Sequence, residues 1–264
     1  MPYLYPTPKQ QEIIYLIYRF RFLNRIQIQT LLHHKDYRRI NAWLKELTEC
    51  NFLGRIYSKK LLENTKPAIY YLSGKGMQWM EQKYKVSKQQ VKKYYEDKER
   101  SQRFIYHCIF LGDLYLIVQS QTAVEERLEL LTKADLTNEE YDYILHPLPD
   151  AYVVIHKEQE DKSKRYLLEI LDEGIPRYAV KARLKQYIQY ASYGDWERNT
   201  DNIPFPIILL VCPNDRMKKY LYRYIPKLME EEYVTIKFYL STREKVKAQD
   251  LENGVWEKVE GEEG

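Results

Sequence analysis

The chain has 264 residues, of which 44% are hydrophobic, 9 are glycine and 11 are proline. This composition excludes a fibrous or low-complexity protein, and the length favours two globular domains. The net charge of +4 conceals an asymmetry, because residues 1–100 carry 20 Lys and Arg against 9 Asp and Glu, whereas residues 101–264 carry 22 against 29. We therefore expect the first part of the chain to have an anionic partner.

The N-terminal segment predicts amphipathic helices with recognisable starts. Thr7 with Gln10 has the spacing of a capping box, and Asn24 begins a second helix in the same way. Asp36 is a suitable N-cap for a third helix. That helix has apolar residues at helical spacing, at Ile40, Trp43, Leu44 and Leu47. One face of the third helix is therefore expected to be buried and the other exposed.

The third helix precedes two β-rich segments, residues 52–57 and 68–72, which flank a polar loop and predict a hairpin. Three helices followed by a hairpin is the order of a winged helix-turn-helix, which we expect over residues 1–86. Residues 87–103 are highly charged with helical propensity, and we expect them to form a helical connector.

The exposed face of the third helix has the residue types that read DNA. In a helix-turn-helix protein the N-terminal part of this helix meets base edges in the major groove. Arginine recognises guanine and asparagine recognises adenine, whereas wing lysines neutralise phosphates. The predicted DNA-binding residues are Tyr37, Arg38, Arg39, Asn41 and Lys45 in the helix, and Lys59, Lys60 and Lys66 in the wing. The alternatives are an ordinary solvated helix face and a protein-docking module.

Residues 104–245 are expected to form an α/β domain. Residues 104–118 are apolar nearly all round, which predicts a buried helix inside this domain. Strands and helices then alternate, with strands expected at 124–131, 151–156, 166–171, 207–212 and 235–240, and helices at 177–193 and 215–230. Apolar runs such as residues 207–211 indicate strands covered on both faces. Residues 246–264 are expected to be a frayed acidic tail. The fold class is thus a winged helix followed by a mixed α+β or α/β domain.

Several motifs of the second domain occur in a fixed order. They are His107 ahead of residues 111–114, the strand start Pro149-Asp150-Ala151, the acidic strand end 169–174, and Lys181, Lys185 and Tyr187 in the next helix. Together with the N-terminal elements, this order resembles the replication-relaxation family of bacterial plasmids and other mobile elements, from about Lys9 to Leu240. The family usually sets Glu two residues before Asp, whereas Glu169 and Asp172 are three apart. The resemblance implies a DNA-binding accessory role in plasmid replication, relaxation or mobilisation.

The same acidic residues also resemble the core of restriction nucleases, in which a Pro-Asp pair opens one strand and an acid-x-Lys tripeptide lies on the next. This resemblance implies Asp150 and Glu169 as catalytic residues and Mg²⁺ ligands. The tripeptide that begins at Glu169 lacks its lysine, so Lys181 or Lys185 would supply the charge. Asp172 would point away from Glu169, because alternate strand residues share a face. The structural alternative makes Asp150 a cap or turn residue and pairs Glu169 with a helix Lys or Arg.

The cysteines and the hydropathy indicate the compartment. Cys50, Cys108 and Cys212 lack the spacing of a zinc site or disulfide framework, and no segment approaches the roughly 18 apolar residues of a membrane span. We expect a cytoplasmic protein with no membrane partner.

These features predict a DNA-binding accessory or regulatory protein of a plasmid or mobile element, with double-stranded DNA as its partner and no cofactor. A second copy of the chain and a replication or transfer protein are further candidate partners. Two alternatives stay open. One is a Mg²⁺-dependent endonuclease or nickase that uses the second domain, and the other is a transcription repressor whose second domain senses a small molecule.

Overall fold

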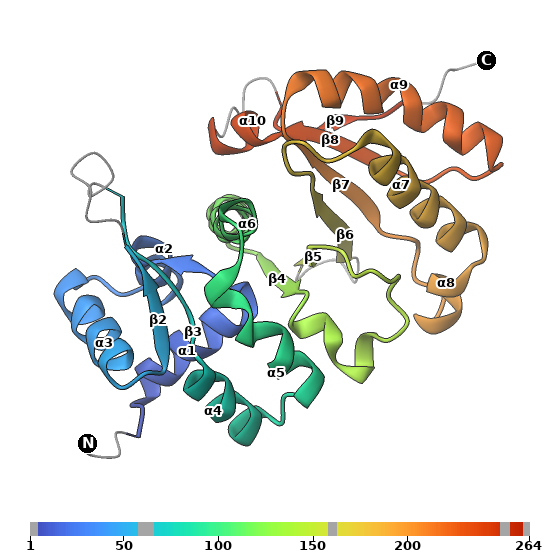
Figure 1. The fold of residues 1–264 in the computed structure, drawn as a ribbon. Helices are drawn as coiled ribbons and strands as arrows, with labels where there is room; N and C mark the ends of the chain where they lie inside the picture. Colours follow the sequence, from blue (N-terminus) through green and yellow to red (C-terminus); the bar gives the residue numbers. More distant parts are fainter. Residues whose placement is uncertain (1–4, 58–65, 158–162, 249–253, 261–264) are drawn as a thin grey trace. The chain divides into compact units, whose positions relative to one another are not determined.

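The computed structural model describes the chain apart from residues 1–4, 58–65, 158–162, 249–253 and 261–264. The chain divides into two compact units, Met1–Leu116 and Ile117–Gly264, and each combines helices with a β-sheet (Figure 1). The expectation of a mixed helix and sheet fold is confirmed.

The first unit contains the predicted order of helices followed by a hairpin. Its elements are α1 (Pro8–Phe20), β1 (Leu23–Asn24), α2 (Arg25–Leu31), α3 (Tyr37–Glu49), β2 (Leu53–Ile56), β3 (Ile69–Leu72), α4 (Gly74–Tyr84), α5 (Lys88–Tyr95), the 3-10 turn η1 (Asp97–Glu99) and most of α6 (Gln102–Gln121). Within the described residues, its antiparallel sheet has the strand order β1-β3-β2. The hairpin β2–β3 directly follows α3 in the chain.

The helix starts have the predicted caps. Thr7 and Gln10 form a capping box at α1, and Asn24 and Gln27 form one at α2. At α3 the Asp36 Oδ1 atom accepts a hydrogen bond of 2.8 Å from the backbone N–H of Arg38. Each cap satisfies an amide group that the first turn of a helix leaves without an intrahelical partner, which is why these positions begin helices.

The expected domain boundary at residue 104 is wrong, because the first part of α6 packs inside the first unit. Phe22 forms a small core with Ile105 and Cys108. Gln27 Nε2 donates to the carbonyl oxygen of Ile109 at 2.7 Å. A Cβ atom at Gly112 would lie 3.0 Å from Gln27 Nε2, so glycine allows this close approach. A helix that is apolar nearly all round can be buried in either unit, and its sequence does not indicate which.

Residues 87–103, expected to be a connector, also pack on the first unit. The Tyr94 hydroxyl donates to the backbone carbonyl oxygen of Tyr18 at 2.7 Å. Asp97 is fully buried and pairs with Arg21, whose guanidinium also lies 4.9 Å from the centre of the Tyr94 ring. The high charge of this segment therefore includes a buried ion pair that attaches it to the end of α1.

The second unit is built on a mixed sheet. Its elements are β4 (Glu126–Thr132), the 3-10 turns η2 (Asp135–Thr137) and η3 (Glu139–Tyr141), β5 (Ala151–Lys157), β6 (Ser163–Ile170), α7 (Arg177–Ser192), α8 (Asp195–Asn199), β7 (Ile207–Cys212), α9 (Asp215–Glu231), β8 (Phe238–Thr242), α10 (Arg243–Ala248) and β9 (Glu257–Lys258). Across the described residues the strand order is β4-β5-β6-β7-β8-β9. Strands β6, β7 and β8 are parallel, and the other pairings are antiparallel.

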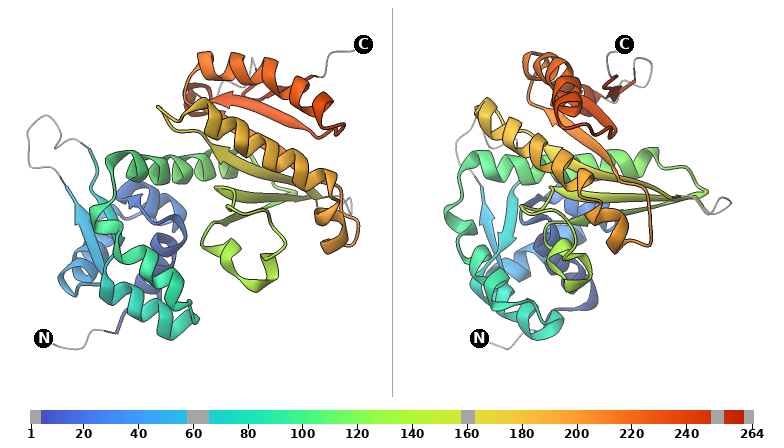
Figure 2. Two further views of the ribbon diagram at one scale, coloured as in Figure 1. Left: turned by 45° about the vertical axis from the view of Figure 1, so that its right-hand side comes forward. Right: turned by 90° about the vertical axis from the view of Figure 1, so that its right-hand side faces the viewer.

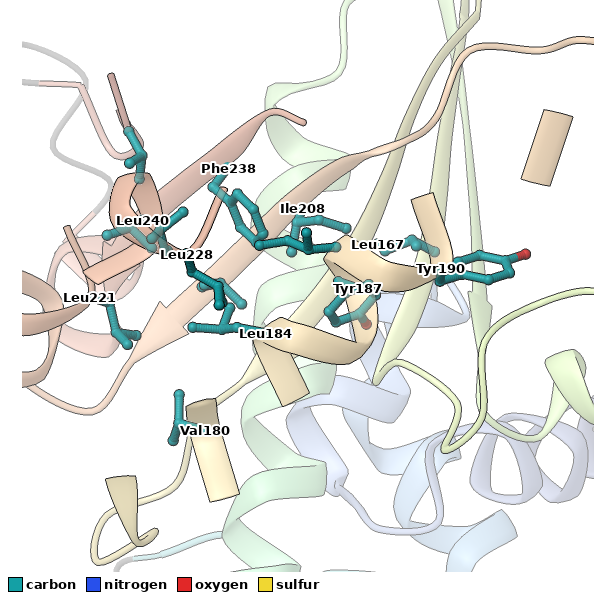
Figure 3. Packing of buried hydrophobic residues seen from close by; sticks show 14 of the residues in the cluster. Leu167, Val180, Leu184, Tyr187, Tyr190, Ile208, Leu221, Leu228, Phe238 and Leu240 are labelled. Carbon is teal, nitrogen blue, oxygen red and sulfur yellow. The ribbon is translucent and has the colours of Figure 1, made fainter. Parts of the chain in front are cut away.

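Helices α7 and α9 bury their apolar faces in one core against this sheet (Figure 2). The core joins residues of α7, α9 and the central strands, among them Leu184, Tyr187, Leu221, Leu228, Leu167, Ile208, Phe238 and Leu240 (Figure 3). Burying a side chain of this size contributes about 1.5–3 kcal/mol to stability. The core therefore holds α7 and α9 on the same face of the sheet.

The expectation of a frayed tail over residues 246–264 is wrong for part of that segment. Strand β9 pairs antiparallel with β8, and Leu240 lies opposite Glu257. The Val259 backbone N–H donates to the carbonyl oxygen of Phe238 at 2.9 Å, and the Val259 side chain is buried. An uncovered strand edge leaves backbone groups without partners, and β9 satisfies those of β8.

Candidate functional site

Helix α3 exposes the five of its residues that were predicted to contact DNA, four of them in its N-terminal half. The apolar stripe of the helix is fully buried at Ile40, Leu44 and Leu47. The opposite face exposes the predicted set, Tyr37, Arg38, Arg39, Asn41 and Lys45. This face is the one that a partner outside the chain can reach.

Over the part of the chain that the structure describes, the cations of α3 contact neighbours on their own helix. The Arg38 guanidinium lies 5.9 Å from the centre of the Tyr37 ring, and that of Arg39 lies 5.6 Å from the Trp43 ring. Lys45 Nζ is 3.7 Å from Glu49 Oε1, and both side chains are mostly exposed. Such a surface pair contributes about 0–1 kcal/mol, so a phosphate can replace the carboxylate at little cost.

The hairpin β2–β3, which follows α3 in the chain, carries further cations. Lys66 is exposed, whereas Lys59 and Lys60 lie outside the described residues. The structure also reveals exposed Arg55 in β2, whose guanidinium lies 4.7 Å from the centre of the Tyr57 ring. Arg55 was not among the predicted residues. Strand alternation puts it on the same face as buried Leu53, two residues earlier, so the sequence pattern gives no signal for its exposure.

The strand register brings Asp150 and Glu169 together in the second unit. In the sheet, Ala151 of β5 lies opposite Leu168 of β6 and opposite Thr132 of β4. The same register continued by one residue places Lys133, Asp150 and Glu169 in one row. Residues directly opposite each other in antiparallel strands project from the same face. The side chains of Asp150 and Glu169 therefore project from the same face as Lys133, which directly follows the end of β4.

Both carboxylates are buried, and both accept hydrogen bonds. Asp150 Oδ1 accepts a hydrogen bond of 2.6 Å from Lys133 Nζ, and its Oδ2 accepts one of 2.7 Å from the backbone N–H of Ile170. Glu169 Oε1 accepts from Arg183 Nε at 2.8 Å and from the Tyr187 hydroxyl at 2.6 Å. We call Lys133, Asp150, Glu169, Arg183 and Tyr187 the buried ion network, after its two buried carboxylates; the Lys133 side chain is itself 54% exposed.

Burial and the close carboxylates shift the pKa values of the buried ion network. Burial raises the pKa of Glu169, and the charge of Asp150 raises it further, against the opposing charges of Arg183 and Lys133. Burial lowers the pKa of Lys133, but the carboxylates of Asp150 and Glu169 more than offset this, so that the pKa is raised. The charged form of Glu169 thus depends on the cations around it.

The donor set of the network does not fit Mg²⁺ as arranged. Mg²⁺ takes about six oxygen ligands in octahedral geometry, several of them waters, and the protein usually supplies one or two carboxylates whose oxygens face the ion. Both Asp150 oxygens and Glu169 Oε1 already accept hydrogen bonds, and two carboxylates face two cations, Lys133 and Arg183. Over the described ranges, His, Cys, Asp and Glu side chains form no group of three that could hold a metal ion. A divalent cation would have to displace Lys133 or Arg183.

Lys181 does not join the acidic pair. Its Nζ atom lies 4.6 Å from the centre of the Tyr224 ring on α9, and Lys185 pairs with Glu232 at 2.7 Å. Arg183, two residues after Lys181, faces the sheet instead, because α7 turns by about 100° per residue. Asp172, which follows the end of β6 by two residues, forms an ion pair with Arg243.

Three comparisons relate the chain to known proteins. The model of the replication-relaxation family matches residues 14–205. Curated protein sequences give no match. Among solved structures, restriction endonuclease FokI aligns with 94% of this chain at 11% identity and a TM-score of 0.34, and this chain covers 45% of the length of that one. So low a score establishes neither a common fold nor a common activity.

The family match covers the regions described above. It extends from α1 through α3 and the hairpin to Asp150, Glu169 and α7. In the described ranges, every helix is too short or too polar for a bilayer span. Because the family model matches most of the chain, the protein belongs to the replication-relaxation family.

Proposed function

We propose that this protein is a DNA-binding accessory protein of a plasmid or mobile element, and that α1–α3 with the hairpin β2–β3 form a winged helix-turn-helix. The observation that carries the proposal is the exposed cationic start of α3, where Arg38 and Arg39 have no buried acidic partner among the described residues. Family membership supports a role in replication, relaxation or mobilisation.

The chemistry of the helix start matches base recognition in duplex DNA. Arg38 and Arg39 carry the fork of donors that pairs with the two acceptors of guanine, and Asn41 pairs with adenine. Arg55 and Lys66 of the hairpin would contact phosphates, which adds affinity without sequence preference. The net charge of residues 1–100 attracts the duplex before these contacts form.

The affinity for a duplex is expected to fall steeply with salt. If six or more phosphates are contacted, the association constant drops by about 10³-fold or more between ~50 and ~200 mM salt, because bound cations are released from DNA. Fluorescence anisotropy of a labelled duplex across this range measures the slope. A response that stays flat would instead indicate a partner that is not a polyanion.

A Mg²⁺-dependent endonuclease is the second candidate function. One observation favours it, namely that Asp150 and Glu169 lie side by side on one face of the sheet. Against it stand the cations that already occupy both carboxylates. We therefore propose that the buried ion network stabilises the second unit and has no part in DNA cleavage.

Supercoiled plasmid incubated with the protein and Mg²⁺ is expected to remain supercoiled. Gel electrophoresis over hours follows the conversion to nicked or linear forms, and Asp150→Asn serves as the matched variant. Nicking by the unmodified chain that Asp150→Asn abolishes would establish the endonuclease and overturn the structural assignment of the network.

A further inference from the structure

The outer face of α9 carries a line of cations. Between Asp215 and Glu230 the helix contains no acidic residue. Its apolar face is buried in the core, and the exposed face carries Arg216, Lys219, Arg223 and Lys227. Their spacing of three, four and four residues aligns them along one side of the helix over about 16 Å. Within the described part of the chain, none of the four pairs with a carboxylate.

Helix α7 extends this line on the same face of the sheet. The Arg177 guanidinium lies 4.4 Å from the centre of the Tyr220 ring, and Lys181 Nζ lies 4.6 Å from that of Tyr224. The two rings stack on each other at 5.9 Å with 6° between their planes. We call Arg177, Lys181, Arg216, Lys219, Arg223 and Lys227 the α7–α9 stripe.

A cavity continues the α7–α9 stripe at the N-terminal ends of both helices. It has a volume of about 380 Å³, and its lining includes Arg177, Arg216 and Asn214, together with Asp172, whose carboxylate pairs with Arg243. It lies beyond the carboxyl ends of the parallel strands β6 and β7, where the free backbone N–H groups of α7 and α9 add partial positive charge. One end of the stripe therefore borders a cavity that is large enough for a phosphate group.

The charge of the stripe contrasts with the rest of its unit. Residues 117–264 have 28 acidic against 21 basic residues, yet α7 has four basic residues and no acidic one. A net negative unit repels polyanions except where cations are concentrated. A surface that contacts one side of a polyanion requires such a concentration of cations on one face of an otherwise acidic unit.

We propose that the α7–α9 stripe is a second DNA-binding surface, which contacts the phosphate backbone of a duplex independently of sequence. The inference rests on the proposed function for its choice of polyanion. Duplex DNA carries about one negative charge per 1.7 Å of its axis, so a line of about 16 Å faces several phosphates. Tyr220 and Tyr224 are stacked on each other and covered by cations, which favours backbone contacts over base stacking.

The test compares two full-length variants that lose the same charge. Arg223→Gln with Lys227→Gln removes two cations of the stripe. Lys164→Gln with Lys237→Gln removes two exposed cations near the opposite ends of the parallel strands. Binding to a labelled duplex of random sequence is measured by anisotropy from ~50 to ~300 mM salt. The stripe variant is expected to bind roughly ten- to thirtyfold more weakly at ~0.15 M salt, with a log–log slope lowered by about two. The control pair is expected to match the unmodified chain.

The outcomes separate this inference from the proposed function. Equal affinities and slopes for the two variants overturn the stripe, whatever the variant at Arg38 and Arg39 does. A weakened stripe variant together with unchanged binding after substitution of Arg38 and Arg39 supports the stripe and overturns the role of α3. If the stripe variant binds an acidic protein or anionic vesicles more weakly but keeps its affinity for DNA, the stripe is also overturned as a DNA surface. Thermal unfolding of both variants is expected to match the unmodified chain, since all four residues are exposed.

Discussion

Replacing Arg38 and Arg39 together with alanine is expected to abolish sequence-specific DNA binding while the fold survives. Each arginine that pairs with a guanine contributes about 1–3 kcal/mol of discrimination, so the two together account for about 30-fold to more than 10⁴-fold in affinity. Both side chains are exposed and their contacts are with neighbouring rings of α3, so the free energy of unfolding should change by about 0.5 kcal/mol at most.

The measurement is a gel shift on the chain's own binding site, with a scrambled duplex as competitor. Lys92→Ala with Lys98→Ala is the matched control, because both lysines are exposed cations of the same unit outside α3 and the hairpin. The control is expected to retain its preference for the specific site. Equal loss of affinity in both variants would mean that only net charge matters, and α3 would not be the reading element.

Replacing Arg183 with methionine is expected to destabilise the second unit by about 3–5 kcal/mol. The substitution leaves the buried Glu169 carboxylate without its main counter-charge, and an uncompensated buried charge is costly. For a unit of this size the midpoint of thermal unfolding should fall by about 10 °C. Circular dichroism or calorimetry on the full chain measures the change.

Two further variants establish the cause. Arg198→Met makes the same substitution in the exposed Arg198–Asp195 pair, where the expected cost is about 1 kcal/mol or less. Adding Glu169→Gln to Arg183→Met removes the unpaired charge and should recover part of the lost stability. A fall in midpoint that is equal for Arg183→Met and Arg198→Met would exclude a stabilising role for the network.

Local sequence signals predicted the long elements of this protein well. The caps at Thr7, Asn24 and Asp36 act within one helical turn, so they place α1, α2 and α3 whatever the rest of the chain does. The apolar run of β7 was predicted with its observed ends, because a strand buried on both faces has no polar alternation to obscure it. The short elements α8 and β9 were missed, since their few residues provide no periodicity.

Contacts between distant segments could not be predicted in the same way. Lys133 meets Asp150 only because β4 and β5 pair in one particular register, and a shift of one residue would turn it to the other face. Lys181 or Lys185 was predicted to supply the charge at Glu169, but the rotation of α7 on the sheet presents Arg183 there instead.

The sequence by itself determined the helix starts, the central strands, the division of charge along the chain and the exposed face of α3, since each depends on neighbours within a few residues. Only the tertiary structure decided that α6 belongs largely to the first unit, that Arg183 and Lys133 neutralise the acidic pair, and that cations of α7 and α9 form one surface. Those arrangements depend on strand register and helix rotation. Packing over the whole unit sets both, so no pattern within a short stretch of sequence predicts them.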